Sequence, residues 1–218
     1  MEVFLLFGAG LIAGAINSLA GGGSFIAFPA LLLAGVPPVF ANATNTFAAL
    51  PGYVTGAIGY WSDLRAHKAD LLKYGLAALA GGLIGAELLL NLDDESFSAA
   101  VPWLIAVAVA LFAFGQQINR WIGQRSGSMS GAARFGAALL LLLMVVISIY
   151  GGFFNAGFGI VLLAFFALAG HTDIHAMNGL KLAISAVVAA IAVVRFALGG
   201  AIAWYEGSLV FAGTLIGG

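Results

Sequence analysis

Three polar side chains lie on one face at the start of an apolar segment: Asn42, Asn45 and Thr46. They occupy positions i, i+3 and i+4, which are neighbours on the surface of a helix. In the second half of the chain, Asn178 and Lys181 repeat the i, i+3 spacing inside another apolar segment. No carboxylate lies within one helical turn of Lys181, and a lysine in an apolar environment is costly unless a negative group compensates it. These residue types and spacings predict a binding site for a small anion.

The same residues also have structural interpretations, which the sequence leaves open. Asn42, Asn45 and Asn178 are suited to hydrogen bonds between packed helices. Lys181 could instead extend its charged end towards the membrane interface. A structure distinguishes these interpretations by where each side chain points.

Three consecutive glycines, Gly21, Gly22 and Gly23, interrupt the first apolar stretch. Glycine lets membrane helices pack closely, which accounts for most of the 31 glycines in the chain. Three in a row, however, destabilise a helix by about 3 kcal/mol, which is more than close packing requires. We therefore expect a break here, followed by a helix that begins near Ser24 and leaves the backbone N–H groups of residues 24–26 free to attract negative charge.

A second glycine-spaced segment occurs in the other half, where Asn155 is followed by Gly157 and Gly159. The apolar pieces after the two breaks, 25–33 and 160–169, are too short to cross a hydrocarbon core of about 30 Å at about 1.5 Å per residue. We interpret them as re-entrant half-helices, which lie at membrane depth only inside protein or beside a cavity. Asn17 and Asn155 precede the breaks, where they either cap the freed backbone or contact the ligand.

The composition places the chain in a membrane. Of its 218 residues, 62% are hydrophobic and 8% are charged, whereas soluble domains have about 25% charged residues. Apolar runs of about 20 residues are long enough to span the hydrocarbon core. The chain is therefore predicted to be an all-α, polytopic integral membrane protein. Seven runs are candidate spans: 3–19, 40–61, 71–92, 97–114, 135–154, 177–198 and 201–218.

Charged residues in the connecting segments predict the orientation. Segments 62–73 and 119–134 are rich in lysine and arginine, whereas 91–98 holds three acidic residues and no base. Basic loops stay in the cytoplasm, so the first two segments are predicted to be cytoplasmic and the third external. This order predicts an external N-terminus. No cleavable signal is evident, so we expect the mature chain to retain residue 1.

The two halves of the chain match each other after a shift of 136 residues, which places Asn42 on Asn178 and Asn45 on Lys181. Each copy would cross the membrane an odd number of times, so the copies form inverted repeats with a substrate site between them near the midplane. The second copy lacks a counterpart of the last span, so we expect the natural chain to continue or another subunit to fill the gap. The predicted units are repeat 1 at 1–120 (broken helix pair 3–35, spans 40–61, 71–92 and 97–118), a cytoplasmic linker at 121–132, and repeat 2 at 133–218 (broken helix pair 135–169, spans 176–198 and 201–218).

Both halves contain motifs of one known family. The motifs are the stretch 14–29, the segment Ala41-Asn42-Ala43-Thr44-Asn45-Thr46 with Pro51-Gly52 and Gly59-Tyr60, and Met177-Asn178-Gly179-Leu180-Lys181 with Ile202-Ala203-Trp204. On these residues the chain resembles the TauE/SafE sulfite-exporter family over nearly its whole length. The resemblance implies a bacterial inner-membrane transporter of small anions such as sulfite, organosulfonates or related carboxylates. It does not identify the substrate.

The remaining ionisable residues suggest fewer roles. Glu87 and His175 are candidates for proton coupling, although Glu87 is equally suited to pair with a base. His67, His171 and His175 do not have a metal-ligand spacing, and the chain has no cysteine. No set of nucleophile, base and orienting group is visible in the spans. We therefore predict no metal, no cofactor, no catalytic residues and no enzymatic activity.

Taken together, these features predict a secondary transporter that moves a small anion by alternating access of a site between the repeats. Export is the expected direction, because an interior-negative potential drives anions outward, whereas import would need a coupled cation. The expected partners are the small anion and membrane lipid, with no nucleic acid, and a homodimer is compatible with the sequence. The alternative is a non-transporting membrane subunit or an anion-sensing receptor.

Overall fold

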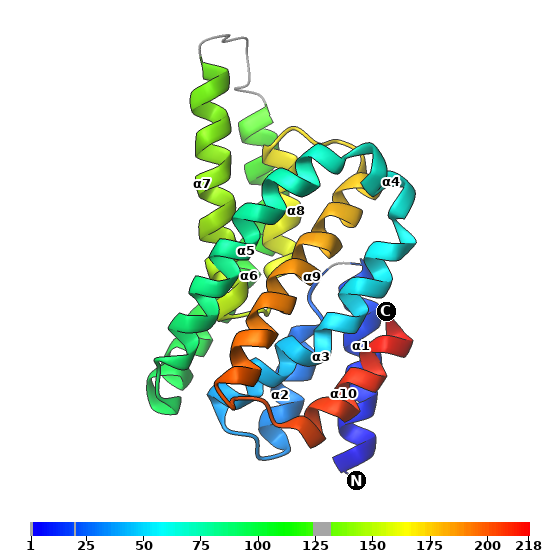
Figure 1. Cartoon of the computed structure of the whole chain (residues 1–218), viewed down its shortest axis with the longest axis vertical. Helices are drawn as coiled ribbons and strands as arrows, with labels where there is room; N and C mark the ends of the chain where they lie inside the picture. The colour runs from blue at the N-terminus through cyan, green and yellow to red at the C-terminus, as the bar shows by residue number, and fades with distance from the viewer. Residues whose placement is uncertain (1, 20, 124–131) are drawn as a thin grey trace.

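The computed structural model describes residues 2–19, 21–123 and 132–218, and the elements in these ranges are helices. The prediction of an all-α membrane protein is confirmed. Figure 1 shows a bundle with long helices crossing its centre and shorter ones around them. The helices are α1 (Glu2–Leu19), α2 (Ser24–Leu33), α3 (Pro38–Gly59), α4 (Trp61–Ala66), α5 (Lys68–Leu90), α6 (Asp94–Gly123), α7 (Ala132–Phe153), α8 (Phe158–Leu168), α9 (Ile174–Leu198) and α10 (Trp204–Gly217).

Most helix bounds agree with the predicted spans, and three differ. The segment 62–73, predicted as a loop, holds α4 and the start of α5, with Asp70 in the first turn of α5, where an acidic side chain stabilises the helix start. Helix α6 continues to Gly123 instead of ending at 118. Helix α10 begins at Trp204 instead of 201. Of the predicted linker 121–132, residues 124–131 lie outside the described residues.

Two helix pairs double back at their glycine breaks. In the first, α1 ends before the break and α2 returns towards the end at which α1 began, and α7 and α8 do the same from the opposite end of the bundle (Figure 1). Gly21 has φ +83° and Gly157 has φ +77°, a left-handed conformation that glycine adopts without strain. Both breaks thus turn the chain through a glycine with the same handedness.

The ends of the two short helices also match. After α2 the backbone N–H of Val36 donates to Leu31 O at 3.1 Å, and after α8 that of His171 donates to Phe166 O at 3.0 Å. Gly35 and Gly170, which precede these donors, have φ +84° and +95°. Each helix therefore ends in the same left-handed glycine cap, at positions 135 residues apart.

Helix packing pairs the first helix of each half with a helix of the other half. Helix α1 packs closely on α10, where Gly10 lies against the Val210 carbonyl. Helix α7 packs closely on α5, where Gly81 lies against the Val145 carbonyl. At both contacts a glycine lets two backbones touch, as is usual between membrane helices. In this exchanged packing, the first helix of each half lies against a helix of the other half. A duplication with opposite orientations would produce such an arrangement.

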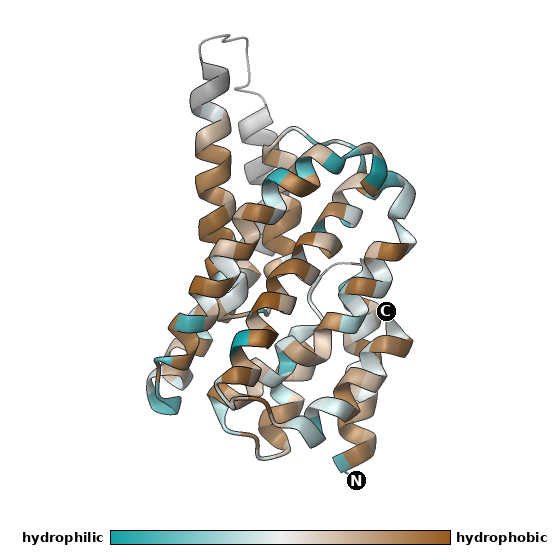
Figure 2. Cartoon of the chain, in the orientation of Figure 1, coloured by the Kyte–Doolittle hydropathy of each residue, from teal (hydrophilic) through white to brown (hydrophobic). Residues whose placement is uncertain are grey.

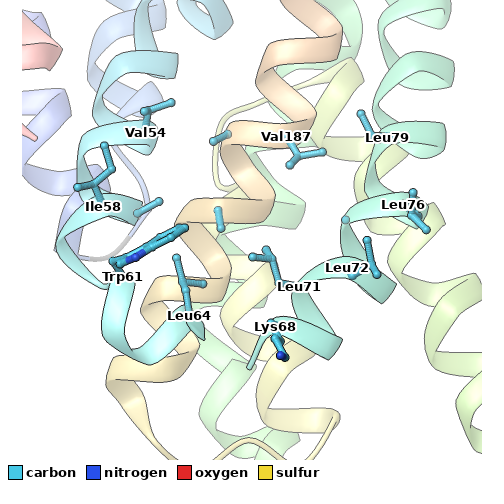
Figure 3. Close-up of a pocket in the computed structure, with 14 residues that line it drawn as sticks. Val54, Ile58, Trp61, Leu64, Lys68, Leu71, Leu72, Leu76, Leu79 and Val187 are labelled. Carbon is cyan, nitrogen blue, oxygen red and sulfur yellow. The ribbon is translucent and has the colours of Figure 1, made fainter. Parts of the chain in front are cut away.

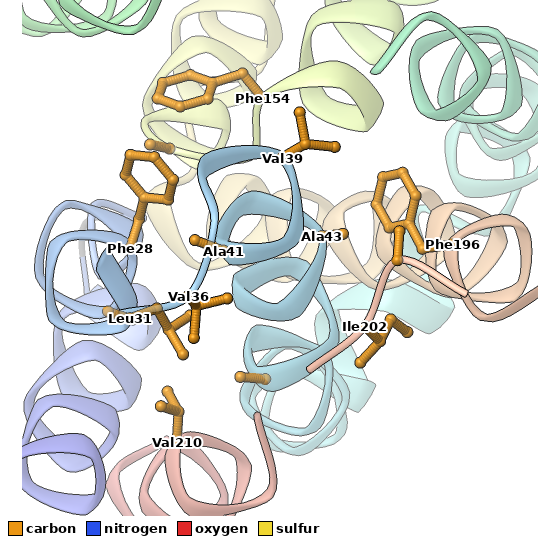
Figure 4. Close-up of a cluster of buried hydrophobic side chains, with 14 of the residues drawn as sticks. Phe28, Leu31, Val36, Val39, Ala41, Ala43, Phe154, Phe196, Ile202 and Val210 are labelled. Carbon is orange, nitrogen blue, oxygen red and sulfur yellow. The ribbon is translucent and has the colours of Figure 1, made fainter. Parts of the chain in front are cut away.

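Helix α3 runs through the centre of the bundle. Its buried residues pack against α2, α9 and α10, and the aromatic rings of Phe28, Phe97 and Phe154 meet edge to face beside it. Figure 4 shows Phe28 and Phe154 on one side of α3, and Phe196 with Ile202 on the other. The start of α3 is therefore enclosed by both halves of the chain.

The outer surface of the bundle is apolar over most of its length. Hydrophilic residues gather at its ends, on α4 and at the turn between α5 and α6 (Figure 2). Three of the described segments are long and apolar enough to cross a membrane, by length and composition: Lys68–Leu90, Gly136–Phe153 and Ile174–Leu198.

Candidate functional site

Lys181 lies in the interior of the protein. Its side chain extends from α9 and is 1% exposed. The ammonium group donates hydrogen bonds to Asn178 Oδ1 at 3.0 Å and to the carbonyl oxygen of Asn17 at 3.3 Å. Both partners are neutral, and no carboxylate of the described ranges lies within ion-pair distance of Lys181. The side chain does not extend to the membrane interface, and its charge has no counterion within the described residues.

The two glycine breaks touch each other beside Lys181. A Cβ atom placed on Gly21 would lie 2.7 Å from the Cα of Gly159, and one placed on Gly159 would lie 2.8 Å from the Cα of Gly21. The same Cβ on Gly159 would lie 3.4 Å from Cδ of Lys181. Only glycine fits at either position, because any side chain would overlap the opposite backbone. The structure thus brings both breaks and the buried lysine into one place.

The first break is closed by local hydrogen bonds. Asn17 Oδ1 accepts from the backbone N–H of Gly23 at 2.8 Å, so this side chain caps the break. Phe25 N–H donates to Gly22 O and Ile26 N–H donates to Gly23 O. The expectation that residues 24–26 all offer free N–H groups is therefore wrong for Phe25 and Ile26, because the first turn of α2 tightens into i→i+3 bonds. The backbone supplies less positive potential to a ligand than the sequence predicted.

The second break is arranged differently. Asn155 is 3% exposed, and its Oδ1 accepts from the Tyr53 hydroxyl at 3.2 Å, while its Nδ2 has no hydrogen-bond partner. The Tyr53 hydroxyl also lies close to Ser24, whose own hydroxyl is buried without a hydrogen-bond partner. Tyr150 donates to the carbonyl of Ala156 at 2.7 Å and holds the break from the other side. Asn155 does not cap its break with its side chain, and part of its amide remains free.

Tyr53 is a residue that the sequence prediction missed. It lies seven residues after Thr46 on the same face of α3, so the face that begins with Asn42 continues to the breaks. The signal was present in this spacing, but a buried tyrosine in an apolar segment is usually part of the core. Its polar contact depends on the second break, which is 102 residues away in sequence.

The polar row at the start of α3 faces the second break. Asn42 Nδ2 donates to the carbonyl of Phe153, the last residue of α7, at 2.7 Å, and Asn42 Oδ1 has no hydrogen-bond partner. Asn45 is 1% exposed, and neither atom of its amide has a hydrogen-bond partner. Thr46 donates to the carbonyl of Asn42 at 3.0 Å and is thus satisfied within its own helix. Asn42 thus forms a hydrogen bond between packed helices, which is the structural role considered for it from the sequence. Asn45 forms no such bond within the described residues.

Buried polar atoms without hydrogen-bond partners gather along the two breaks and the helices that contact them. Such atoms are costly in a protein interior, and each calls for an explanation. Among the described residues they occur on α3, on α9, in the second break and at the start of α2. They are Ser24 Oγ, Asn42 Oδ1, Asn45 Nδ2, Asn45 Oδ1, Asn155 Nδ2 and Ser185 Oγ.

The two predicted proton-coupling residues lie away from Lys181. Glu87 forms an ion pair with Arg195, with both nitrogens Nε and Nη2 donating to its carboxylate. Arg195 is 14 residues, or about 21 Å of helix, beyond Lys181. His175 is exposed at the start of α9, where its ring lies 6.2 Å from that of Tyr60. Neither predicted residue contacts the buried cluster.

A pair of histidines lies at the end of the bundle that carries α4. The rings of His67 and His171 are 5.5 Å apart, and His171 Nε2 lies 3.5 Å from an Asp70 carboxylate oxygen. Burial lowers the pKa of His171, against the opposing effect of Asp70, and His67 adds to the lowering. His171 therefore takes up a proton less readily than a free histidine does.

An apolar groove lies elsewhere on the protein. It has a volume of about 500 Å³, is lined almost wholly by apolar side chains of α3, α4, α5 and α9, and opens at the surface. Figure 3 shows Trp61, Leu64 and Leu72 around it, with Lys68 at one edge. Its α9 residues, Ala183, Ala186 and Val187, lie on the side of α9 that faces away from Lys181. The groove therefore does not belong to the buried polar cluster.

The broken helices, the buried Lys181 with its neutral described partners and the apolar surface fit an integral membrane protein built of α-helices. Residues 6–218 match the model of the family described as "Sulfite exporter TauE/SafE", and the chain belongs to this family. The resemblance noted in the sequence is thereby confirmed, and the fold and family together place the protein in a membrane.

Curated relatives cover the chain almost completely. A "Probable membrane transporter protein ORF9" of Sinorhizobium sp is 33% identical over 97% of this chain and 78% of the relative. A "Probable membrane transporter protein" of Haemophilus influenzae is 29% identical over 98% of this chain and 81% of its own length. The "Probable membrane transporter protein YfcA" of Escherichia coli K12 is 27% identical over 98% of this chain and 77% of the relative. No solved structure matches the chain.

Proposed function

We propose that this protein is a secondary transporter that moves a small oxyanion, such as sulfite, an organosulfonate or a related carboxylate, across the bacterial inner membrane. The observation that carries the proposal is Lys181, which is buried at the contact of two helix breaks with only neutral partners. A buried charge without a counterion is strongly destabilising. A bound anion is the partner that would offset it. The proposal includes no catalytic step.

The site has the groups that an oxyanion needs. Ser185 lies one helical turn after Lys181 on the same face of α9, and the two breaks that meet beside Lys181 carry Ser24 and Asn155. The hydroxyls of Ser24 and Ser185 and the amide nitrogen of Asn155 are buried without a hydrogen-bond partner among the described residues. Hydroxyls and amide nitrogens donate hydrogen bonds, and an ammonium group makes the strong, charge-assisted kind. Several such donors around one cation favour a compact ligand with several acceptor oxygens. The family name, which includes sulfite export, agrees with this chemistry.

We infer that transport works by alternating access between two inverted repeats. Three observations support this inference: the left-handed glycines at both breaks, the matching caps of α2 and α8, and the exchanged packing of α1 on α10 and α7 on α5. Lys181 is closed off from the surface in this structure. A movement of one repeat against the other would open the site to one side and then to the other.

Net export is the expected direction. With an interior-negative membrane, moving one negative charge outward gains about 2.3 kcal/mol per 100 mV. Such a gain needs no coupled ion. Glu87, which would be the first candidate for proton coupling, is held by Arg195 away from the buried cluster. We therefore propose passive, potential-driven export.

The central experiment measures sulfite flux in proteoliposomes with Lys181→Met, an apolar side chain of similar length. We expect the flux to fall by about tenfold or more, because the charge that attracts the anion is absent. Lys68→Gln is the matched control, since Lys68 is exposed at the edge of the apolar groove, and it should leave the flux unchanged. Flux of Lys181→Met within twofold of the unsubstituted protein would contradict the proposed role of Lys181.

The direction is tested with the same proteoliposomes under imposed potentials. Efflux of sulfite should rise when the lumen is made negative and fall when it is made positive. Flux that does not respond to the potential, or that requires a proton gradient, would overturn passive export. Absence of flux together with thermal stabilisation by sulfite in detergent would instead support an anion-sensing receptor.

A further inference from the structure

Lys181 and Asn45 occupy matching positions in the two halves of the chain. Each follows an asparagine by three residues, Asn178 and Asn42 respectively. Each pair reaches the last part of the other half's broken helix: Lys181 donates to the carbonyl of Asn17, and Asn42 donates to the carbonyl of Phe153, 136 residues later. The pair Asn42 and Asn45 therefore contacts the broken helix of the other half as the pair Asn178 and Lys181 does, with neutral side chains alone and through its first member instead of its second.

The two positions are too far apart to share one small ligand. Helices α3 and α9 run antiparallel, because Gly56 lies against Leu182 and Tyr60 lies beside Gly179. Lys181 is thus level with the last turns of α3. Asn45 lies eleven residues before Gly56, which corresponds to about 16 Å of helix. The prediction of one pocket that contains Asn45 and Lys181 therefore does not fit this geometry.

The polar groups around Asn45 are buried and unsatisfied. Asn45 is 1% exposed, and neither its nitrogen nor its oxygen has a hydrogen-bond partner. Asn42 is also 1% exposed, and because its nitrogen faces the carbonyl of Phe153, the oxygen is the atom left free. An amide oxygen only accepts hydrogen bonds. A ligand here must bring a donor for Asn42 and can accept one from Asn45.

We propose that Asn42 and Asn45 form a second binding station, separate from the Lys181 cluster, for a small oxyanion that carries an O–H or N–H donor. This inference rests on the proposed transport function and adds a second stop on the path of the solute. Tyr53 lies on α3 between Asn45 and the level of Lys181, and its hydroxyl donates to Asn155. The charged station attracts the anion, and the neutral station selects solutes that can donate a hydrogen bond.

Two sulfonates that differ by one hydroxyl test the selection. Isethionate carries an O–H donor and ethanesulfonate does not, and their binding is measured by thermal stabilisation of the purified protein in detergent. We expect the unsubstituted protein to bind isethionate about five- to tenfold more tightly, as for one hydrogen bond to a buried group. Asn45→Leu should reduce this preference to below about twofold.

Two further variants separate the stations. Thr55→Val is the matched control, because Thr55 lies on the same helix and its hydroxyl bonds only to the carbonyls of Pro51 and Gly52; it should keep the preference. Lys181→Met should weaken the binding of ethanesulfonate by about tenfold and that of isethionate less, because the neutral station still binds the hydroxylated solute. If Asn45→Leu keeps the full preference while Lys181→Met weakens binding, the second station is wrong and the proposed function stands. If Lys181→Met changes nothing, the proposed function itself is wrong.

A cysteine at position 46, beside the station, provides a measurement that leaves both asparagines in place. The chain has no native cysteine, so Thr46→Cys introduces a single thiol next to Asn45. We expect isethionate to slow its reaction with a small maleimide by about fivefold, because the bound solute covers it. Equal reaction rates with and without isethionate would overturn the station.

Discussion

The two helix breaks share a backbone and differ in the side chains around them. Both turn through a left-handed glycine. The first is capped by Asn17 and faces the charged Lys181, whereas the second is left uncapped by Asn155 and faces the neutral Asn42 and Tyr53. The glycines thus preserve the geometry of both breaks, while the polar side chains give the two sides of the protein different chemistry. Two breaks of similar backbone geometry therefore carry different polar side chains.

The glycine contact at the centre should give the largest effect when it is altered. Gly21→Ala places a Cβ at 2.7 Å from the Cα of Gly159 and puts a side chain on a backbone with φ +83°. We expect a destabilisation of about 3 kcal/mol or more, from overpacking and backbone strain together. The measurement is the melting temperature and the yield of monodisperse protein in detergent.

A glycine in open space provides the control for this substitution. Gly75 lies in α5, and nothing is within 4 Å of a Cβ added to it. Gly75→Ala should therefore leave the melting temperature unchanged or raise it, because alanine stabilises a helix interior by about 0.5 to 1 kcal/mol relative to glycine. Equal melting temperatures for Gly21→Ala and Gly75→Ala would show that the two breaks do not touch.

Removal of the two asparagines compares the breaks directly. Asn17→Ala removes the acceptor of the Gly23 N–H and should cost about 1 to 2 kcal/mol, as loss of a helix cap does. Asn155→Ala removes only the acceptor of the Tyr53 hydroxyl and should cost about 1 kcal/mol. In transport, the order should reverse, with Asn155→Ala giving the lower flux. Greater destabilisation by Asn155→Ala than by Asn17→Ala, measured by thermal melting, would contradict the difference between the breaks.

The tyrosines of the second break separate a role in transport from a role in packing. Tyr53→Phe removes a hydroxyl that faces the polar cluster, and we expect sulfite flux to fall about two- to fivefold. Tyr150→Phe removes the hydrogen bond to the Ala156 carbonyl. It should lower the free energy of unfolding by about 1 kcal/mol, and with it the melting temperature, and leave the flux unchanged. A larger loss of flux in Tyr150→Phe would reverse the assignment.

The smallest effect concerns the histidine pair at the α4 end. Because burial lowers the pKa of His171, the folded protein binds fewer protons than the unfolded chain just below pH 6.5. Stability should therefore fall as the pH drops below about 6.5, and His171→Gln should flatten this dependence. Melting curves in detergent between about pH 5 and 8 measure it. An unchanged slope in His171→Gln would exclude this residue as the cause.

The sequence predicted the helices and the breaks well because both depend on local properties. Runs of apolar residues and the consecutive glycines at 21–23 determine where helices form and stop, whatever surrounds them. The burial of Lys181 also followed from its apolar neighbours in sequence. Segment 62–73 was predicted as a loop because its charges suggest exposure, although charged residues also form short helices such as α4 at a membrane surface.

The arrangement of the site was harder to predict because it depends on contacts between distant segments. The partner of Tyr53 is 102 residues away, and the separation of Asn45 from Lys181 follows from the register between α3 and α9. Equal spacing along two helices shows that residues share a face, but an antiparallel pairing places equivalent positions at opposite ends. The same pairing is the reason that we propose two stations in place of one predicted pocket.

The contact of Gly21 with Gly159 has a mechanical consequence. Where two backbones touch without side chains, no rotamers interlock, so shear between the halves of the molecule would meet a low barrier at this point. The Glu87–Arg195 pair, which joins α5 to α9 at an exposed position, would have to separate in such a shear. Because salt screens exposed ion pairs, the rate of turnover should increase with ionic strength.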